Sequence, residues 1–216
     1  YTDNYVVIDD GPLGTTCARV GCMPSKVLIQ VANDYDRRKK FEQMGIEGGD
    51  NLKLDSAAVM KHVRTLRDRF VRGVMGSLTD WEKHLMRERA KFIDQNTLQV
   101  GEEKIEAKKI IIATGSRPFI PKEWKDYREN IVTTDEFFEL EKLPKKMAVF
   151  GLGVIGLELG QALNRLGVEV VACTTNKAVG GLTDPKLQDY VSGKVQEEMN
   201  VHFSAAKPVE ANDKGQ

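Results

Sequence analysis

The chain has 216 residues, of which 41% are hydrophobic, enough for the buried core of one or two α/β domains. Lys and Arg total 32 and Asp and Glu total 32, so no net field favours nucleic acid or an anionic membrane as a partner. With three cysteines and no visible secretory or membrane-spanning segment, we expect a cytoplasmic protein.

The first apolar segment, YVVID at residues 5–9, predicts a short buried strand that ends in Asp9. An acid in this position hydrogen-bonds a ribose in dinucleotide-binding folds. Such folds also need a first strand and a G-x-G-x-x-G turn about twenty residues before the acid. Because the chain starts at Tyr1, we expect its N-terminus to be truncated.

The run GTTCARVGCMPSK places Cys17 and Cys22 five positions apart. In a regular helix with a rise of about 1.5 Å per residue, such a pair exceeds the roughly 4.4–6.8 Å between Cα atoms that a disulfide tolerates. We therefore expect a distorted turn, for which Gly14 and Gly21 supply the backbone freedom. The positive end of the helix that follows Lys26 favours a thiolate nearby, so the segment predicts a redox couple.

Two other interpretations of these cysteines stay open at this point. A structural disulfide is one, although it is more typical of a secreted protein. A zinc site is the other, but structural zinc needs four Cys or His ligands, and His62, His84 and His202 lie without ligand spacing. We predict no metal site.

The middle of the chain alternates helix and strand. Residues 23–40 predict a helix that ends in a basic, solvated run, and apolar residues at helical spacing predict an amphipathic helix over residues 55–85. Short strands are expected at residues 89–94, 97–100 and 104–107. The apolar run Ile110–Ala113 predicts a buried parallel strand leading into Thr114, Gly115 and Ser116, where the glycine lets a ligand approach the backbone.

A second unit is predicted to begin near residue 144, which divides the chain into residues 1–143 and 144–216. A strand at 147–150, a helix at 154–166 and a strand at 168–173 surround a G-x-G-x-x-G turn. The helix is expected to turn Ile155 and Leu159 inward, and Cys173 is expected to be a buried small hydrophobe. The turn predicts a pyrophosphate site at the helix N-terminus, formed by Gly151, Gly153 and Gly156. A further helix and strand follow, and we expect this unit to be incomplete at Gln216.

The string GPLGTTCARVGCMPSK resembles the redox-active segment of the FAD-dependent pyridine nucleotide–disulfide oxidoreductases, and its PSK ending is most similar to their dihydrolipoamide dehydrogenase branch. IIIATGSRP at 110–118 is similar to the family's flavin-domain segment, and residues 149–170 are similar to its NAD-binding fingerprint. The resemblance covers residues 9–170. It implies tandem Rossmann-like FAD- and NAD(P)-binding domains, both incomplete in this chain.

The resemblance also implies roles for individual residues. Cys22 corresponds to the thiol beside the flavin, Cys17 to the outer thiol that exchanges with substrate, and Lys26 to the cation near the flavin's reactive nitrogen. Glu158 should face the nicotinamide, and we predict that it forms an ion pair with Lys26, because a lone buried charge there is costly. The remaining implied contacts to FAD or the coenzyme are Asp9, Thr16, Ala90, Thr114, Gly115, Ser116, Gly151, Gly153, Val154, Ile155, Gly156 and Thr174.

The sequence departs from the family in two places. Thr174, followed by Thr175, Asn176 and Lys177, stands where NAD-specific members carry an acid, which leaves NAD and NADP both open with a slight preference for NAD. The family's catalytic base, a His paired with a Glu in a C-terminal dimerisation domain, has no counterpart here, so we expect a homodimer formed through a domain absent from this chain.

The resemblance implies electron transfer between NAD(P)H, FAD and a Cys17–Cys22 disulfide, with lipoamide as the favoured substrate. Glutathione-like disulfides, mercuric ion and transhydrogenation are alternatives within the family. A nucleotide-binding fragment without turnover is the alternative outside it.

Overall fold

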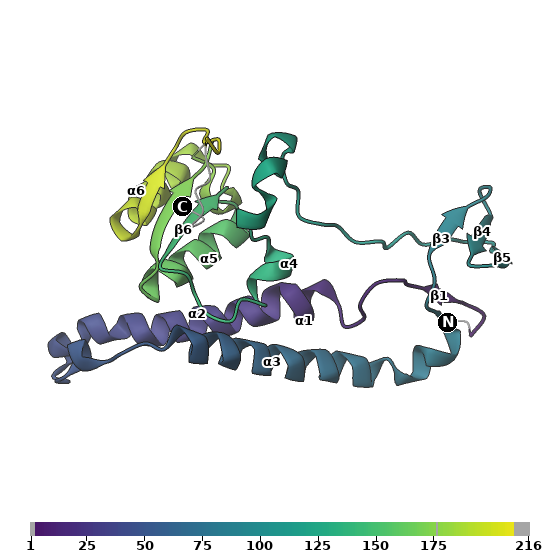
Figure 1. Cartoon of the computed structure of the whole chain (residues 1–216), viewed down its shortest axis with the longest axis horizontal. Coiled ribbons are helices and arrows are strands. Elements are labelled where there is room, and N and C mark those ends of the chain that lie inside the picture. Colours follow the sequence, from purple (N-terminus) through teal and green to yellow (C-terminus); the bar gives the residue numbers. More distant parts are fainter. Residues whose placement is uncertain (1–2, 176, 210–216) are drawn as a thin grey trace.

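The structure, a computed structural model, describes residues 3–175 and 177–209. It has three parts: a long helical hairpin, an α/β unit that rests on one end of the hairpin, and small β-sheets near the other end (Figure 1).

The helical hairpin carries the two cysteines. Helix α1 (Thr16–Val20) leads into α2 (Cys22–Asp36), which runs beside α3 (Ser56–Ser77). Helix α3 begins where the Asp55 carboxylate accepts hydrogen bonds from the backbone N–H groups of Ala57 and Ala58 at 2.9 and 3.1 Å, as a favourable N-cap does. Both predicted helices are present, and short 3-10 helices link or extend them at Arg37–Lys40, Glu42–Met44, Gly49–Asn51 and Thr79–His84.

The α/β unit contains a parallel sheet in the order β6 (Lys146–Phe150), β7 (Glu169–Cys173) and β8 (Asn200–His202). Helix α5 (Val154–Arg165) connects the first two strands, and α6 (Pro185–Glu198) connects the last two. The predicted strand–turn–helix–strand order is confirmed. Both connections return to a parallel neighbour; β7 and β8 contain buried residues, while β6 alternates exposed and half-buried residues.

Two details of that unit differ from expectation. Ile155 is 59% exposed rather than inward, because it lies in the first turn of α5, where no described element covers it. Cys173, expected to be buried, is half-buried at the end of β7. The rest of the inward face is as predicted, with buried Leu159 and Leu163.

The hairpin and the α/β unit share one hydrophobic core. Leu28 of α2 and Met60 of α3 belong to the same buried cluster as Leu163 of α5. Arg165 ties the same elements together, since its Nη1 donates to Asn33 Oδ1 at 2.6 Å. This core includes the segment around α4 (Thr134–Phe137), so it crosses the predicted boundary near residue 143, and the boundary itself stays a prediction.

The small sheets lie near the opposite end of the hairpin (Figure 1). Strands β3 (Ala90–Phe92), β4 (Thr97–Val100) and β5 (Glu103–Glu106) form an antiparallel sheet close to the predicted positions. Strand β1 (Val7–Ile8) pairs in parallel with β2 (Leu85–Met86). The predicted strand at residues 5–9 is therefore only two residues long and half-buried, because β2 is its one partner within the described residues.

The predicted buried strand Ile110–Ala113 is wrong. These residues belong to an irregular connector between β5 and the 3-10 helix Lys122–Asn130, with Ile111 90% and Ile112 70% exposed. The connector runs free of the sheets in Figure 1. An apolar run becomes a buried strand only beside other strands, and the described part of the chain places none next to this one.

No described helix is both long enough and apolar enough to cross a membrane.

Candidate functional site: a dithiol turn beside a glycine-rich turn

A break in the helix brings the two thiols together. Helix α1 ends at Val20, and Gly21 adopts φ −127° and ψ −121°, outside the helical region, before α2 begins at Cys22. A Cβ on Gly21 would lie 3.1 Å from Thr16 O and 3.2 Å from Cys17 Cα. The missing side chain thus permits a close approach of the turn to Cys17, and the predicted distortion is confirmed.

The thiols of Cys17 and Cys22 are both free and exposed. A side-chain hydrogen bond with Cys22 raises the pKa of Cys17, and desolvation raises it further, against the lowering effect of the Cys22 and Met23 backbone groups. Cys17 in the dithiol form is therefore not the low-pKa thiolate that the helix end alone suggests. Two thiols that share a hydrogen bond are placed to form a disulfide with each other when a substrate disulfide takes up the two electrons.

An unusual backbone conformation precedes the dithiol. Thr15 has φ 61° and ψ 147°, and it is the sole non-glycine residue with positive φ in the described part of the chain. Its Oγ1 accepts a hydrogen bond from Ala18 N at 3.1 Å and so caps α1. Thr16, an implied cofactor contact, is the exposed first residue of that helix. Strain of this kind persists where the surrounding structure fixes it, often at functional sites.

The predicted ion pair between Lys26 and Glu158 is present. Lys26 lies one turn into α2 and Glu158 one turn into α5, so the pair joins the dithiol helix to the helix of the glycine-rich turn. The Glu158 side chain is 34% exposed and that of Lys26 is 59% exposed. The position of this pair beside a flavin stays a prediction.

The G-x-G-x-x-G turn has the geometry of an anion-binding site. Gly151 has φ 87°, and a Cβ on Gly156 would lie 1.9 Å from Gly151 O, so only glycine fits where the helix meets the turn. Gly153 is the N-cap of α5 and provides no side chain to occupy the helix N-terminus. Val154 and Ile155, at the start of that helix, are exposed. These features fit a pyrophosphate bound to the first backbone N–H groups.

The end of β7 holds the residues expected near the coenzyme ribose. Thr174 follows the strand, and its backbone N–H donates to His202 O at 3.0 Å. Lys177 Nζ donates a hydrogen bond to Asp189 Oδ1 at 2.9 Å. Asn176 lies outside the described residues. The described part of this edge therefore offers no arginine pair for a 2′-phosphate.

The residues implied for FAD lie apart from the glycine-rich turn. Asp9 follows β1, accepts a hydrogen bond from Gly11 N at 2.7 Å and lies 3.7 Å from Arg87 Nη1. Ala90 begins β3 and is exposed. Thr114, Gly115 and Ser116 are exposed in the connector, and a Cβ on Gly115 would meet nothing within 4 Å. The backbone at Gly115 is therefore open to a ligand such as a flavin. Among the described residues, no backbone hydrogen bond joins Thr114, Gly115 or Ser116 to β1 or to Ala90.

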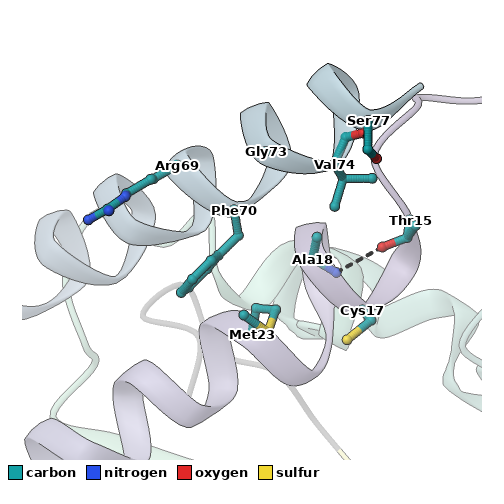
Figure 2. A pocket seen from close by; sticks show the side chains of 9 residues that line it. All are labelled: Thr15, Cys17, Ala18, Met23, Arg69, Phe70, Gly73, Val74 and Ser77. Atoms are coloured by element: carbon teal, nitrogen blue, oxygen red, sulfur yellow. Dashed lines mark hydrogen bonds between the residues drawn. The ribbon is translucent and has the colours of Figure 1, made fainter. Parts of the chain in front are cut away.

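The sequence did not predict a pocket beside Cys17. It has a volume of about 750 Å³ and lies between α1–α2 and α3 (Figure 2). Phe70 and Val74 belong to the amphipathic helix expected over residues 55–85, and only the tertiary arrangement shows that they line a pocket. The residues lining the pocket are Thr15, Cys17, Ala18, Met23, Arg69, Phe70, Gly73, Val74 and Ser77.

Comparison with known proteins gives consistent matches. The family model described as pyridine nucleotide-disulphide oxidoreductase matches residues 2–216. The chain is 32% identical to a dihydrolipoyl dehydrogenase of Bacillus subtilis over 97% of its own length and 46% of the relative's. It is 30% identical to a mercuric reductase of Lysinibacillus sphaericus over 86% of this chain and 34% of that protein.

A structural match supports the fold. A flavoprotein disulfide reductase of Escherichia coli, RclA, solved as a Cu(II) complex, superimposes with a TM-score of 0.74 at 18% identity. The match covers 93% of this chain and 43% of that one. The chain therefore spans less than half the length of the first two relatives and of this solved structure.

Proposed function

We propose, because the chain belongs to the pyridine nucleotide–disulphide oxidoreductase family, that it forms the dithiol and coenzyme-binding part of a flavin-dependent disulfide oxidoreductase. The observation that carries this proposal is the Cys17–Cys22 dithiol, set at a helix break and linked to the glycine-rich turn by the Lys26–Glu158 ion pair. A structural disulfide requires neither a free, exposed dithiol nor a pocket lined by one of its cysteines.

The dithiol performs the exchange. Cys17, a residue of the pocket lining, attacks one sulfur of a substrate disulfide through its Sγ, forms a mixed disulfide and releases the first substrate thiol. Cys22 Sγ then attacks Cys17 Sγ, closing the Cys17–Cys22 disulfide and releasing the second thiol. The two thiol protons of the protein pass to the two released thiols, so the substrate gains two electrons and the protein loses two. The reverse sequence oxidises a dithiol substrate.

The structure supports this order of attack. Cys17 borders the pocket, whereas Cys22 does not belong to its lining. The hydrogen bond with Cys22 raises the pKa of Cys17, so attack at neutral pH needs a base to take the proton. The family resemblance implies a His–Glu pair as this base, reached across a homodimer.

The cofactor sites are proposed from the residues that fit them. Gly151, Gly153 and Gly156 would hold the pyrophosphate of NAD(P) at the N-terminus of α5. Asp9, Thr16, Ala90 and residues 114–116 would contact FAD. A bound FAD supplies the two-electron chemistry that couples nicotinamide oxidation to the disulfide. Lys26, held by Glu158, would keep a fixed positive charge on the dithiol side of that site.

The substrate proposed first is lipoamide, on the strength of the PSK ending and the dihydrolipoyl dehydrogenase relatives. Mercuric ion is the second candidate, since one relative is named a mercuric reductase. NAD is the coenzyme proposed first, because the described end of β7 lacks the arginine pair that a 2′-phosphate favours.

The test uses the natural, full-length protein with Cys22→Ser, and Cys173→Ser as the matched control. In Cys22→Ser, lipoamide reduction should fall by about a thousandfold or more, because the mixed disulfide at Cys17 cannot be resolved. Flavin reduction by NADH and transfer to an artificial acceptor should persist. Equal loss of both activities in a folded, flavin-loaded variant would contradict the proposal.

A further inference from the structure

The pocket beside Cys17 has a largely apolar lining, which the proposed disulfide exchange does not by itself require. Its walls between Cys17 and the far end are largely apolar, with Met23 from α2 and Phe70 and Val74 from α3 (Figure 2). Gly73 lies between these two α3 residues, and a Cβ there would meet nothing within 4 Å. The pocket therefore has room for an aliphatic chain laid along α3.

The pocket is elongated along α3. It includes α3 residues from Arg69 to Ser77, eight positions that extend about 12 Å along a helix. Figure 2 shows Thr15 near the Ser77 end and Arg69 at the opposite end, with Cys17 between them close to Met23. A molecule whose disulfide meets Cys17 can thus extend past Phe70 toward a single guanidinium group.

Arg69 is the one charged residue in the lining, and the structure gives it no ion-pair or hydrogen-bond partner among the described residues. Its neighbour Arg67 is different, because it is paired with Asp68 at 2.9 Å and with Glu139. An unpaired guanidinium at the end of an apolar pocket is suited to a carboxylate or similar anion, which it can bind through charge-assisted hydrogen bonds.

We propose that this pocket selects disulfides whose aliphatic chain ends in an anionic group, and that Arg69 is the residue that determines this preference. The inference rests on the proposed function, because it assigns a substrate class to the same dithiol. It adds no chemical step: Cys17 and Cys22 exchange two electrons and two protons with the substrate as before, while Arg69 only binds the chain's end.

Lipoate and lipoamide form the matched pair of probes, since they share the dithiolane ring and chain and differ only in the terminal charge. The measurement is the ratio of kcat/KM for lipoate to that for lipoamide in the full-length, flavin-loaded protein. Arg69→Gln should lower this ratio about tenfold, the equivalent of about 1.4 kcal/mol and the scale of a hydrogen bond to a charged group.

Two variants serve as controls. Arg72→Gln removes an arginine of the same helix that is exposed, as Arg69 is, but does not line the pocket, and it should leave the ratio within about twofold. Arg69→Lys keeps the charge and should retain more of the ratio than Arg69→Gln. A ratio that is equal in Arg69→Gln and the natural protein overturns the inference while leaving the proposed disulfide reduction intact.

A second measurement needs no turnover. In full-length protein carrying Cys22→Ser, a methanethiosulfonate reagent forms an S–S bond with Cys17 Sγ as methanesulfinate leaves, and the product is identified by peptide mass. The rate ratio of the sulfonatoethyl to the trimethylammonioethyl reagent should fall about fivefold in Arg69→Gln, as expected for the loss of one nearby charge in water.

The two measurements separate the possible failures. If neither lipoate nor lipoamide is reduced but the labelling ratio responds to Arg69→Gln, the proposed function fails and the anion preference of the pocket stands. If both probes are reduced and neither ratio responds, the proposed function stands and the inference is overturned. If nothing is reduced and the labelling ratio does not respond, both are overturned.

Discussion

Two regions of the molecule have the same local pattern, an apolar run followed by a glycine-containing turn, but they fold differently. In the α/β unit, residues 146–202, the run becomes strand β6 of a three-stranded parallel sheet, and Gly151 opens the turn into α5. In the connector, residues 107–121, the run around Ile111 is exposed, and a Cβ on Gly115 would meet nothing within 4 Å. The difference lies in the neighbours: β6 pairs with β7 and packs Met147 and Val149 against the core, although its alternate residues stay exposed, whereas no described strand pairs with the connector.

This contrast shows that an apolar pattern alone does not make a strand. Burial of an apolar side chain contributes about 1.5–3 kcal/mol only when another element removes it from water. Strand β6 has β7 beside it and α5 over it, whereas the connector has no such partner among the described residues. Matched substitutions in the two regions can therefore test the contrast directly.

The largest difference is expected for the two turn glycines. Gly156→Val places a side chain where a Cβ alone would lie 1.9 Å from Gly151 O, so the backbone itself must move. We expect a loss of about 4 kcal/mol in the free energy of unfolding, measured by urea denaturation. A Cβ on Gly115 would meet no atom within 4 Å, so the cost of Gly115→Val comes from the φ of 70°, and we expect about 1–2 kcal/mol. Similar losses in the two variants would contradict the contrast.

A pair of apolar residues gives the next largest difference. Leu163 is 1% exposed in the shared core, and Leu163→Ala should lower the free energy of unfolding by about 3 kcal/mol through lost burial and the cavity left behind. Ile111 is 90% exposed, so Ile111→Ala should change it by less than about 0.5 kcal/mol. A large loss for Ile111→Ala would show that the connector is covered in solution.

The same contrast explains how much of the fold the sequence could predict. Units whose strand, turn and helix follow one another in the chain were predicted nearly to the residue, as α5 and the strands around it show. Such units are stabilised by contacts between neighbours in sequence. The strand at Ile110–Ala113 failed because its burial depends on partners that local pattern cannot reveal.

Some features of the candidate site could likewise be predicted from the sequence, and others could not. The Lys26–Glu158 ion pair could be predicted from chemistry, because two charges implied for one place favour each other. The raised pKa of Cys17 could not, since it arises from the orientation of the Cys22 thiol across the Gly21 break. Nor could the pocket, because Arg69 lies more than forty positions from Cys17 and only the packing of α3 beside α1 places them together.

Two aspartates extend the comparison to a smaller effect. Asp184 caps α6 by accepting from Lys186 N and Leu187 N at 2.9 and 3.1 Å, so Asp184→Ala should cost about 1 kcal/mol of unfolding free energy. Asp9, which follows β1, accepts a hydrogen bond from Gly11 N in an exposed loop, and Asp9→Ala should cost less than about 0.5 kcal/mol. Thermal unfolding of both variants under one condition shows which of them loses more stability. A larger loss for Asp9→Ala than for Asp184→Ala would contradict the prediction.

The smallest effect concerns the dithiol turn between the two regions, where chemistry rather than stability should change. The hydrogen bond with Cys22 raises the pKa of Cys17, so fewer Cys17 thiolates exist at a given pH than for an ordinary thiol. Cys22→Ala removes that hydrogen bond and the charge of the Cys22 sulfur, while the backbone groups that lower the pKa stay in place. The pH midpoint for alkylation of Cys17 by neutral iodoacetamide should therefore move down, and alkylation at pH 8 should become faster.

The measurement is the alkylation rate across pH, with Cys17 followed by peptide mass in the fully reduced protein. Cys173→Ala is the matched control, because Cys173 lies at the end of β7 and is not among the groups that shift the pKa of Cys17. It should leave the midpoint unchanged. A midpoint that stays in place or rises in Cys22→Ala would mean that the flanking regions, rather than the contact between the two sulfurs, set the reactivity of Cys17, and the helix break at Gly21 would then not be what tunes the thiol.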